Sequence, residues 1–168
     1  MTAADPIRRL HEHRLWTRAK LLAAARECTH DDLVRPFEMG MGNILATLGH
    51  LWAAEMVWAS VLEQDDPAFP LPKPTQFATL AELEAAWPAL DARWATLLAA
   101  IDQPGALDLP KPRIRDGRTY TTSARDIYLH VCTHQHYHAA QLSNMLRQLG
   151  RTLPGCDLIF MAREQWAG

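Results

Sequence analysis

The stretch SARDIYLHVCTHQHYHAAQLSNMLRQLG, residues 123–150, decides the fold of this chain. Its apolar residues recur at the three- and four-residue spacing of one helix face: Ile127, Val131, Leu142, Met145 and Leu149. We expect the helix to start near Ser123, where the carboxylate of Asp126 complements its N-terminus. It should stop at Gly150, a typical residue just beyond a helix C-terminus.

Three further segments have helical character: residues 5–28, 41–62 and 79–101. Asp5-Pro6 resembles an N-cap followed by proline at the first helical position, where the missing N–H is tolerated. Thr79 with Glu82 three residues later has the pattern of a capping box. Each segment is long enough to cross a small protein.

The connections between these segments carry most of the prolines. Thr29–Pro36 is expected to be a break, Asp65–Thr75 an extended linker and Gln103–Arg118 a loop. Pro88 lies inside the third helix and should bend it. Because no convincing alternating pattern of a strand is present, we predict an all-α fold without a sheet. Four long helices with long connections indicate a four-helix bundle with crossover connections, in one domain spanning residues 1–168.

Composition excludes several classes of protein. The 168 residues carry a net charge of −2, so no phosphate-binding surface and no nucleic-acid partner are expected. Three widely spaced cysteines form no disulfide framework, which suits the reducing cytoplasm. The apolar run Ile44–Leu62 is interrupted by His50 and Glu55, so we interpret it as a buried helix rather than a membrane span. We therefore expect a cytoplasmic protein that is not bound to a membrane.

Four of the eight histidines fall between residues 130 and 138. Histidines four apart on a helix can direct both imidazoles at one ion, and the spacing allows 130/134 or 134/138. Helical phase favours the second pair: with the core near 30°, His138 falls at about 20° and His134 at about 340°. By the same measure, His130 is marginal at about 300° and His136 faces solvent near 180°. His134 and His138 are therefore candidate ligands of a divalent metal ion.

A third ligand has to come from another helix, and periodicity leaves its identity open. His50 falls beside Ala54 and Val57, off the main apolar stripe of its segment, but that segment is apolar nearly all round. Glu55 lies in the stripe, where a carboxylate needs a partner. It is either a fourth ligand, an acceptor for an imidazole N–H, or a solvated glutamate at a bend.

Two stretches resemble the DinB-like proteins. Residues 43–58, NILATLGHLWAAEMVW, are similar to the second-helix signature of that family, a histidine followed by an acidic residue and a tryptophan. Residues 134–150, with two histidines before Gln141 and the Leu146-Arg147 pair, resemble the last-helix signature, and the tail at Pro154–Leu158 also fits. The resemblance covers about residues 5 to 160. One departure is Ala139-Ala140, where the family usually has Arg-Gly.

The resemblance implies a DinB-like four-helix bundle in which His50, His134 and His138 hold one divalent metal ion, often nickel or zinc. Together with the apolar, tryptophan-rich helices and a tail from Cys156 to Gly168 that has no assigned structure, it also predicts a homodimer. Related branches include bacillithiol transferases and mycothiol-dependent maleylpyruvate isomerases, so a metal-dependent enzyme that activates a low-molecular-weight thiol or water is the leading expectation. The alternatives are a non-catalytic metal-binding protein of a stress response and a dimerising bundle with a vestigial site.

Other residues of chemical interest have weaker support. Gln135 occupies the position of the glutamate in HExxH metalloproteases and cannot take a proton, which argues against a peptidase. Cys132 falls about 140° along the helical phase and should point away from the ion. Four basic residues crowd the loop before the last helix, either as a solvated loop or as a site for a ligand's carboxylate at the mouth of a pocket: Lys111, Arg113, Arg115 and Arg118.

Overall fold

The computed structural model describes residues 4–63, 68, 72–73, 75–151 and 155–166. The described chain is mostly helical, with one small two-stranded sheet. Its elements in order are α1 (Ala4–Arg26), α2 (His30–Val34), α3 (Ile44–Glu63), α4 (Leu80–Ala99), the 3₁₀ turn η1 (Ala106–Asp108), β1 (Pro110–Arg115), β2 (Arg118–Ser123), α5 (Ala124–Gln148) and α6 (Leu158–Trp166).

Side-chain caps fix where α4 and α5 begin, as the sequence predicted. Ser123 Oγ accepts a hydrogen bond from the backbone N–H of Asp126 at 3.1 Å, and Thr79 Oγ1 accepts one from that of Glu82 at 3.2 Å. Each bond satisfies a backbone donor that the first turn of a helix leaves unpaired. A capping box also needs a bond from the backbone N–H of Thr79 to the carboxylate of Glu82. Here that carboxylate accepts from the N–H of Ala78 instead, so only the first half of the predicted capping box forms.

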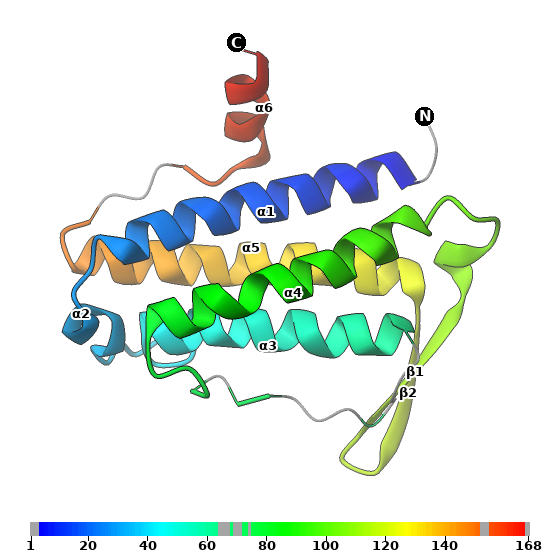
Figure 1. The fold of residues 1–168 in the computed structure, drawn as a ribbon, viewed down its shortest axis with the longest axis horizontal. Helices are drawn as coiled ribbons and strands as arrows, with labels where there is room; N and C mark the ends of the chain where they lie inside the picture. The colour runs from blue at the N-terminus through cyan, green and yellow to red at the C-terminus, as the bar shows by residue number, and fades with distance from the viewer. Residues whose placement is uncertain (1–3, 64–67, 69–71, 74, 152–154, 167–168) are drawn as a thin grey trace.

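The four long helices lie side by side (Figure 1). The best-packed pairs are α5 against α1 and α3, and α4 against α3. In Figure 1, α3 and α4 both run away from the end of the molecule where α2 lies, whereas α1 and α5 run toward that end. The segment between α3 and α4 therefore joins opposite ends of neighbouring helices.

The core lies between these helices. Large side chains with almost no exposed surface come from all four long helices, and examples are Leu21, Leu48, Leu90 and Met145. Within the described residues, α3 is the one helix long and apolar enough to cross a membrane, and 78% of its most apolar window is buried inside the protein. Burial of α3 follows from its composition, because a helix that is apolar nearly all round has no face to present to water.

The prediction that the fold contains no sheet is wrong. Residues 110–123, most of them expected to form a loop, make an antiparallel hairpin in which Pro110 pairs with Ser123 and Arg115 with Arg118. Asp116 and Gly117 form its two-residue turn with φ values of 51° and 72°. This conformation favours Asp-Gly, because glycine has no Cβ and aspartate tolerates positive φ better than most residues. Asp116-Gly117 is therefore the feature of the sequence that indicates a hairpin here.

Three other features differ from the sequence interpretation. The expected break at Thr29–Pro36 contains the short helix α2, started by a complete capping box in which Thr29 and Asp32 exchange side-chain-to-backbone bonds of 3.1 Å. The unassigned tail contains α6. Helix α1 begins at Ala4, so Asp5 lies inside the helix rather than at its N-cap. Pro67, Pro70, Pro74 and Pro154 lie outside the described residues.

Candidate metal centre

Helix α3 presents two different polar side chains on two different faces. His50 lies on the face with Ala54 and Val57, and these three residues line an open pocket between α3 and α5. Glu55 lies on another face, where it is 2% exposed and contacts α1. The apolar surroundings of both residues explain why periodicity alone did not separate their roles.

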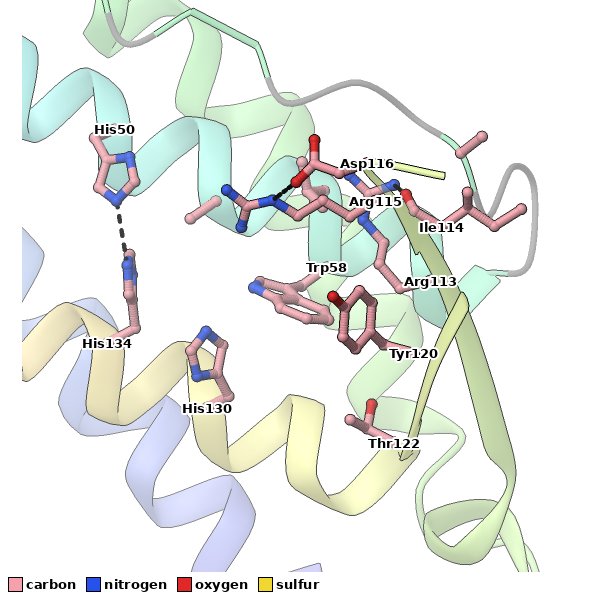
Figure 2. A pocket seen from close by; sticks show the side chains of 13 residues that line it. His50, Trp58, Arg113, Ile114, Arg115, Asp116, Tyr120, Thr122, His130 and His134 are labelled. Carbon is pink, nitrogen blue, oxygen red and sulfur yellow. Dashed lines mark hydrogen bonds and ion pairs between the residues drawn. The ribbon is translucent and has the colours of Figure 1, made fainter. Parts of the chain in front are cut away.

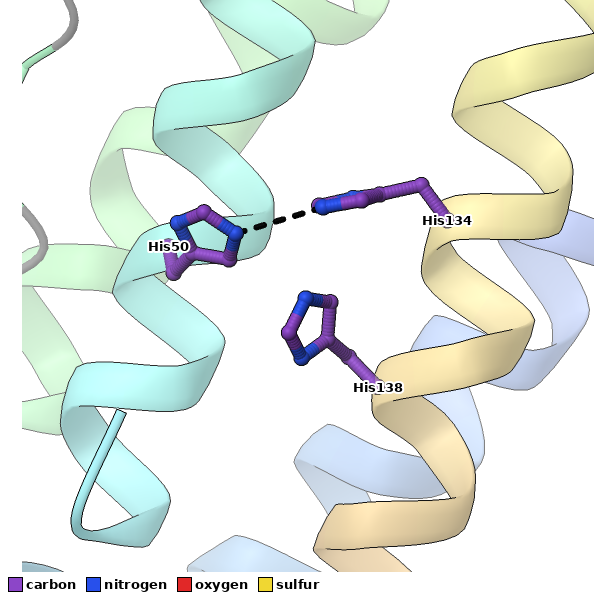
Figure 3. A group of neighbouring side chains, drawn as sticks. All are labelled: His50, His134 and His138. Carbon is purple, nitrogen blue, oxygen red and sulfur yellow. Dashed lines mark hydrogen bonds between the residues drawn. The ribbon is translucent and has the colours of Figure 1, made fainter. Parts of the chain in front are cut away.

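The structure brings together the three histidines expected to form a metal site. Each of His50, His134 and His138 offers one ring nitrogen, and these atoms all lie within 4.8 Å of one another. His50 Nε2 is 3.2 Å from His134 Nε2. Figure 3 shows the three rings directed at a common space between α3 and α5. Because His134 and His138 are one turn apart on α5, the helix places one ring above the other.

The nitrogens of His50 and His134 have the spacing of two ligands of one divalent ion. Two imidazole ligands about 2.0–2.1 Å from zinc in tetrahedral geometry are about 3.3 Å apart. The 3.2 Å between His50 and His134 is close to this value. Two facing Nε2 atoms need either a shared proton or a shared cation between them, and the third ring nitrogen lies within 4.8 Å of both. The triad is therefore a group that could hold a metal ion.

Gln141 fixes the orientation of the third ring. His138 Nδ1 is 2.7 Å from Gln141 Oε1, so Nδ1 carries the proton and donates it to the amide oxygen. The lone pair of Nε2 is then available to an ion, which is how an outer hydrogen bond prepares a histidine ligand. The backbone of Gly40 packs closely against the amide of Gln141, since a Cβ at residue 40 would lie 2.9 Å from Gln141 Oε1.

Burial keeps the triad neutral. Burial first, and then the charges of His138, His50 and His130, lower the pKa of His134 to about 3. The pKa values of His50 and His138 are also lowered, chiefly by burial, although the hydrogen bond that His138 donates to Gln141 opposes this shift. Only a neutral imidazole has a lone pair to donate, so the site favours metal binding over protonation near pH 7.

The remaining residues of the histidine-rich stretch lie outside the triad. His136 is exposed, and its ring lies near that of His13 on α1. Cys132 is buried away from the three rings, and burial raises the pKa of its thiol to about 12. His130 lies closer to the triad than its helical phase suggested: its ring is 5.3 Å from that of His134 and 5.1 Å from that of Trp58.

A pocket of about 830 Å³ opens beside the triad. Figure 2 shows it between α3, α5 and the hairpin. His50 and Trp58 line it from α3, and His130 and His134 from α5. The hairpin contributes Arg113, Arg115, Tyr120 and Thr122. A small molecule in this pocket would therefore reach two of the three triad histidines.

Glu55 is neither a metal ligand nor a solvated residue. Its carboxylate accepts a hydrogen bond from Arg14 Nη1, and Arg18 Nη1 lies 3.8 Å away. Arg18 also donates to Asp91 on α4 at 2.5 Å and packs its guanidinium over the Trp87 ring. These four charged side chains tie α1 to α3 and α4. The expectation that Glu55 needs a partner is confirmed, but the partners are arginines rather than an imidazole or an ion.

Sequence reasoning missed the roles of Gln141, Gly40 and Tyr120. Gln141 was noted only as part of a family signature, although its spacing from His138, three residues along a helix, predicts contact. The place of Tyr120 in the pocket could not be predicted, because the hairpin that carries this residue was not expected. Gly40 gave no signal, because only the folded chain places residue 40 against residue 141.

Comparison with known proteins agrees with this geometry. No curated protein matches the chain at a significant level. The family model described as "DinB family" matches residues 2–167, which is nearly the whole chain. The two signatures that suggested this family contain all three histidines of the triad. The chain belongs to the DinB family.

Proposed function

We propose that this protein is a metal-dependent enzyme in which His50, His134 and His138 hold one divalent ion, with nickel and zinc as the leading candidates. Its reaction would be the attack of a thiol or water on a small electrophilic substrate, as in a thiol S-transferase. Family membership and the close approach of the three histidines support the metal site.

One observation carries the catalytic part of this proposal: the pocket opens directly onto the triad. Among the described residues, the group that could hold an ion has three members, and two of them line the pocket. Structural zinc sites are usually closed by four protein ligands, whereas catalytic sites keep a position for water or substrate. A three-histidine group beside an open pocket has the second arrangement.

A divalent ion at the triad would lower the pKa of a thiol or water that reaches it, making a nucleophile available near neutral pH. Three neutral imidazoles leave the charge of such an ion uncompensated, which favours an anionic nucleophile. The chain's own residues supply the surroundings. Ala54, Val57 and Trp58 give the pocket an apolar wall. Gln135 donates to the backbone of Arg14 and takes no part in the pocket.

We further propose that the four long helices form a DinB-type bundle with crossover connections, and that the protein is a homodimer in the cytoplasm. The dimer is supported by the resemblance and by exposed apolar residues on α6, including Ile159 and Trp166. Sedimentation should show a dimer at tens of micromolar, a range set by weak interfaces with affinities of about a micromolar. A monomer throughout that range would contradict the dimer.

A thiol screen tests the proposed activity. The full chain, loaded with nickel or zinc, would be mixed with several low-molecular-weight thiols and an electrophile such as a chlorodinitrobenzene, and adduct formation would be followed by absorbance. At least one thiol should react faster than without protein. His138→Ala should lose this acceleration, and isothermal titration should show that it also loses metal binding. His136→Ala, a matched change at an exposed position of the same helix, should keep both.

If no thiol reacts and no water-dependent hydrolysis of activated esters is seen while the metal is bound, the protein is not the enzyme proposed. If His138→Ala retained full acceleration, the triad would not be the reactive centre.

A further inference from the structure

The hairpin directs its basic residues toward the pocket. In the observed register Lys111 pairs with Thr122, Arg113 with Tyr120 and Arg115 with Arg118. Alternate residues of a strand share a face, so Lys111, Arg113 and Arg115 project on the same side of β1. Four of these six side chains, those of Arg113, Arg115, Tyr120 and Thr122, line the pocket. The guanidinium of Arg115 therefore extends into the space that leads to the triad, whereas Arg113 Nη1 donates to the carbonyl oxygen of Ile114 at 3.0 Å (Figure 2).

Lys111 attaches this face to the helices. It is 6% exposed, and its Nζ donates to the carbonyl oxygen of Leu62 at 2.6 Å, in the last turn of α3. That carbonyl is one of those a helix end leaves without an internal partner, so the contact satisfies it and complements the helix dipole. At the other end, β2 leads directly into the N-cap of α5 at Ser123. The hairpin is held between the two helices that carry the triad.

The charged side chains at the tip of the hairpin do not stabilise the hairpin. Arg115 and Arg118 lie directly opposite each other, and like charges in such a pair are destabilising. Arg115 also pairs with Asp116, but the two atoms are 3.5 Å apart and both side chains are largely exposed, at 75% and 88%. An ion pair this exposed contributes little. A bound anion would relieve the repulsion and could displace Asp116 easily.

We propose that Arg115, with Arg113 beside it, forms a subsite for the carboxylate of a small organic acid whose reacting end reaches the histidine triad. The acid would have a flat, unsaturated or aromatic body, because the rings of Trp58 and Tyr120 line the same pocket. Arginine suits this role, since its planar guanidinium matches a carboxylate in two hydrogen bonds. Among the described residues that line the pocket, Asp116 is the one acidic residue, beside the two arginines.

This inference rests on the proposed function for the identity of the reacting end, but the subsite can be tested without a metal. Benzoate and benzamide are probes of nearly the same shape, and only benzoate carries the charge. Their affinities for the metal-free full chain would be measured by calorimetry or by NMR titration. Benzoate should bind more tightly than benzamide, and its affinity should fall with added salt. Arg115→Gln should weaken benzoate binding about tenfold, or 1.4 kcal/mol, and leave benzamide unchanged.

Arg26→Gln provides the matched control, because it removes the same charge from an exposed arginine that lies outside the pocket. It should not change benzoate binding. Equal affinities for benzoate and benzamide, or no effect of Arg115→Gln, would overturn the subsite. If inorganic phosphate displaced benzoate at equal concentration, the site would select charge alone and the assignment to carboxylates would be wrong. A failed thiol screen with these binding results intact would reject the proposed activity and retain the subsite.

Discussion

His138 donates its Nδ1 proton to Gln141 Oε1 across 2.7 Å, one turn further along α5. This contact selects the tautomer in which Nε2 of His138 faces the other two histidines (Figure 3). A ring held in this way loses less freedom when it binds an ion, and outer contacts of this kind raise ligand affinity. Gln141 is therefore the residue outside the triad on which metal affinity should depend most.

Replacing Gln141 with leucine should weaken binding of zinc or nickel by about 10- to 100-fold, because Nδ1–H of His138 loses its acceptor. Gln141→Glu should keep or increase the affinity, since a carboxylate accepts the same proton. Calorimetric titration of the metal would measure both. Gln148→Leu, an exposed glutamine near the end of the same helix, is the control and should bind metal as the wild type does. Equal affinity of Gln141→Leu and Gln148→Leu would contradict the role given to Gln141.

Two glycines before α3 offer a second test of the same contact. Gly40 and Gly42 both have positive φ, of 57° and 88°, so alanine is strained at either position and should cost about 1 kcal/mol of stability. Only at Gly40 does the new Cβ meet Gln141, at 2.9 Å, whereas at Gly42 it meets nothing within 4 Å. Gly40→Ala should therefore weaken metal binding more than Gly42→Ala does, and it should also cost more stability, because its Cβ meets Thr47 Oγ1 at 3.1 Å and Met145 Cε at 3.2 Å as well. Matching metal affinities would show that Gly40 does not support Gln141.

Glu55→Gln should destabilise the protein by about 3–5 kcal/mol, because it leaves the buried guanidinium of Arg14 without its counter-charge. The side chains of Glu55 and Arg14 are 3% and 1% exposed. Denaturant unfolding would measure the change. Glu12→Gln, which breaks an exposed ion pair with Arg9, should change stability by no more than about 1 kcal/mol. The folded fraction of Glu55→Gln should still bind metal; loss of the metal from folded protein would mean that Glu55 belongs to the site.

His11 makes stability depend on pH. Burial and the charge of Arg14 lower its pKa from 6.5 to about 3. Its Nε2 bonds to the carbonyl oxygen of Tyr128, and its buried Nδ1 has no partner among the described residues. The native state thus disfavours the charged form, while the unfolded chain takes up a proton below about pH 6.5. The contribution of His11 to stability is therefore fully present above pH 6.5 and decreases as the pH falls toward 3.

The measurement is denaturant unfolding of the metal-free protein at pH 7 and pH 5. His11→Gln, which can still donate to Tyr128 but does not titrate, should lose less stability between the two values than the wild type. An identical loss in both proteins would show that His11 does not carry this dependence.

The helices could be predicted because their signals are local. The caps at Ser123 and Thr79 depend on residues three positions apart, and the alignment of His134 with His138 on α5 follows from helix geometry. The face of His50 could not be derived in this way, since α3 is buried on most sides and periodicity needs a polar face for reference. Only packing showed that Glu55 faces α1 and that His50 faces the pocket.

The hairpin was predictable in principle from Asp116-Gly117, the strongest short signal for a two-residue turn. The prolines and cations around it gave no alternating apolar pattern, because much of this sheet faces a pocket and solvent rather than the core. The contact of Gly40 with Gln141 joins segments far apart in the chain, and no local pattern in the sequence encodes it.

The metal content of single-histidine variants tests the central claim most directly. Purified chain, saturated with nickel or zinc and freed of excess metal, should retain one ion per chain by elemental analysis. His138→Ala should retain almost none, because removing one of three ligands leaves a site too weak to compete with water. His136→Ala should retain the wild-type amount, since its side chain is exposed beside His13. If His138→Ala kept the ion and His136→Ala lost it, the triad would not be the metal site.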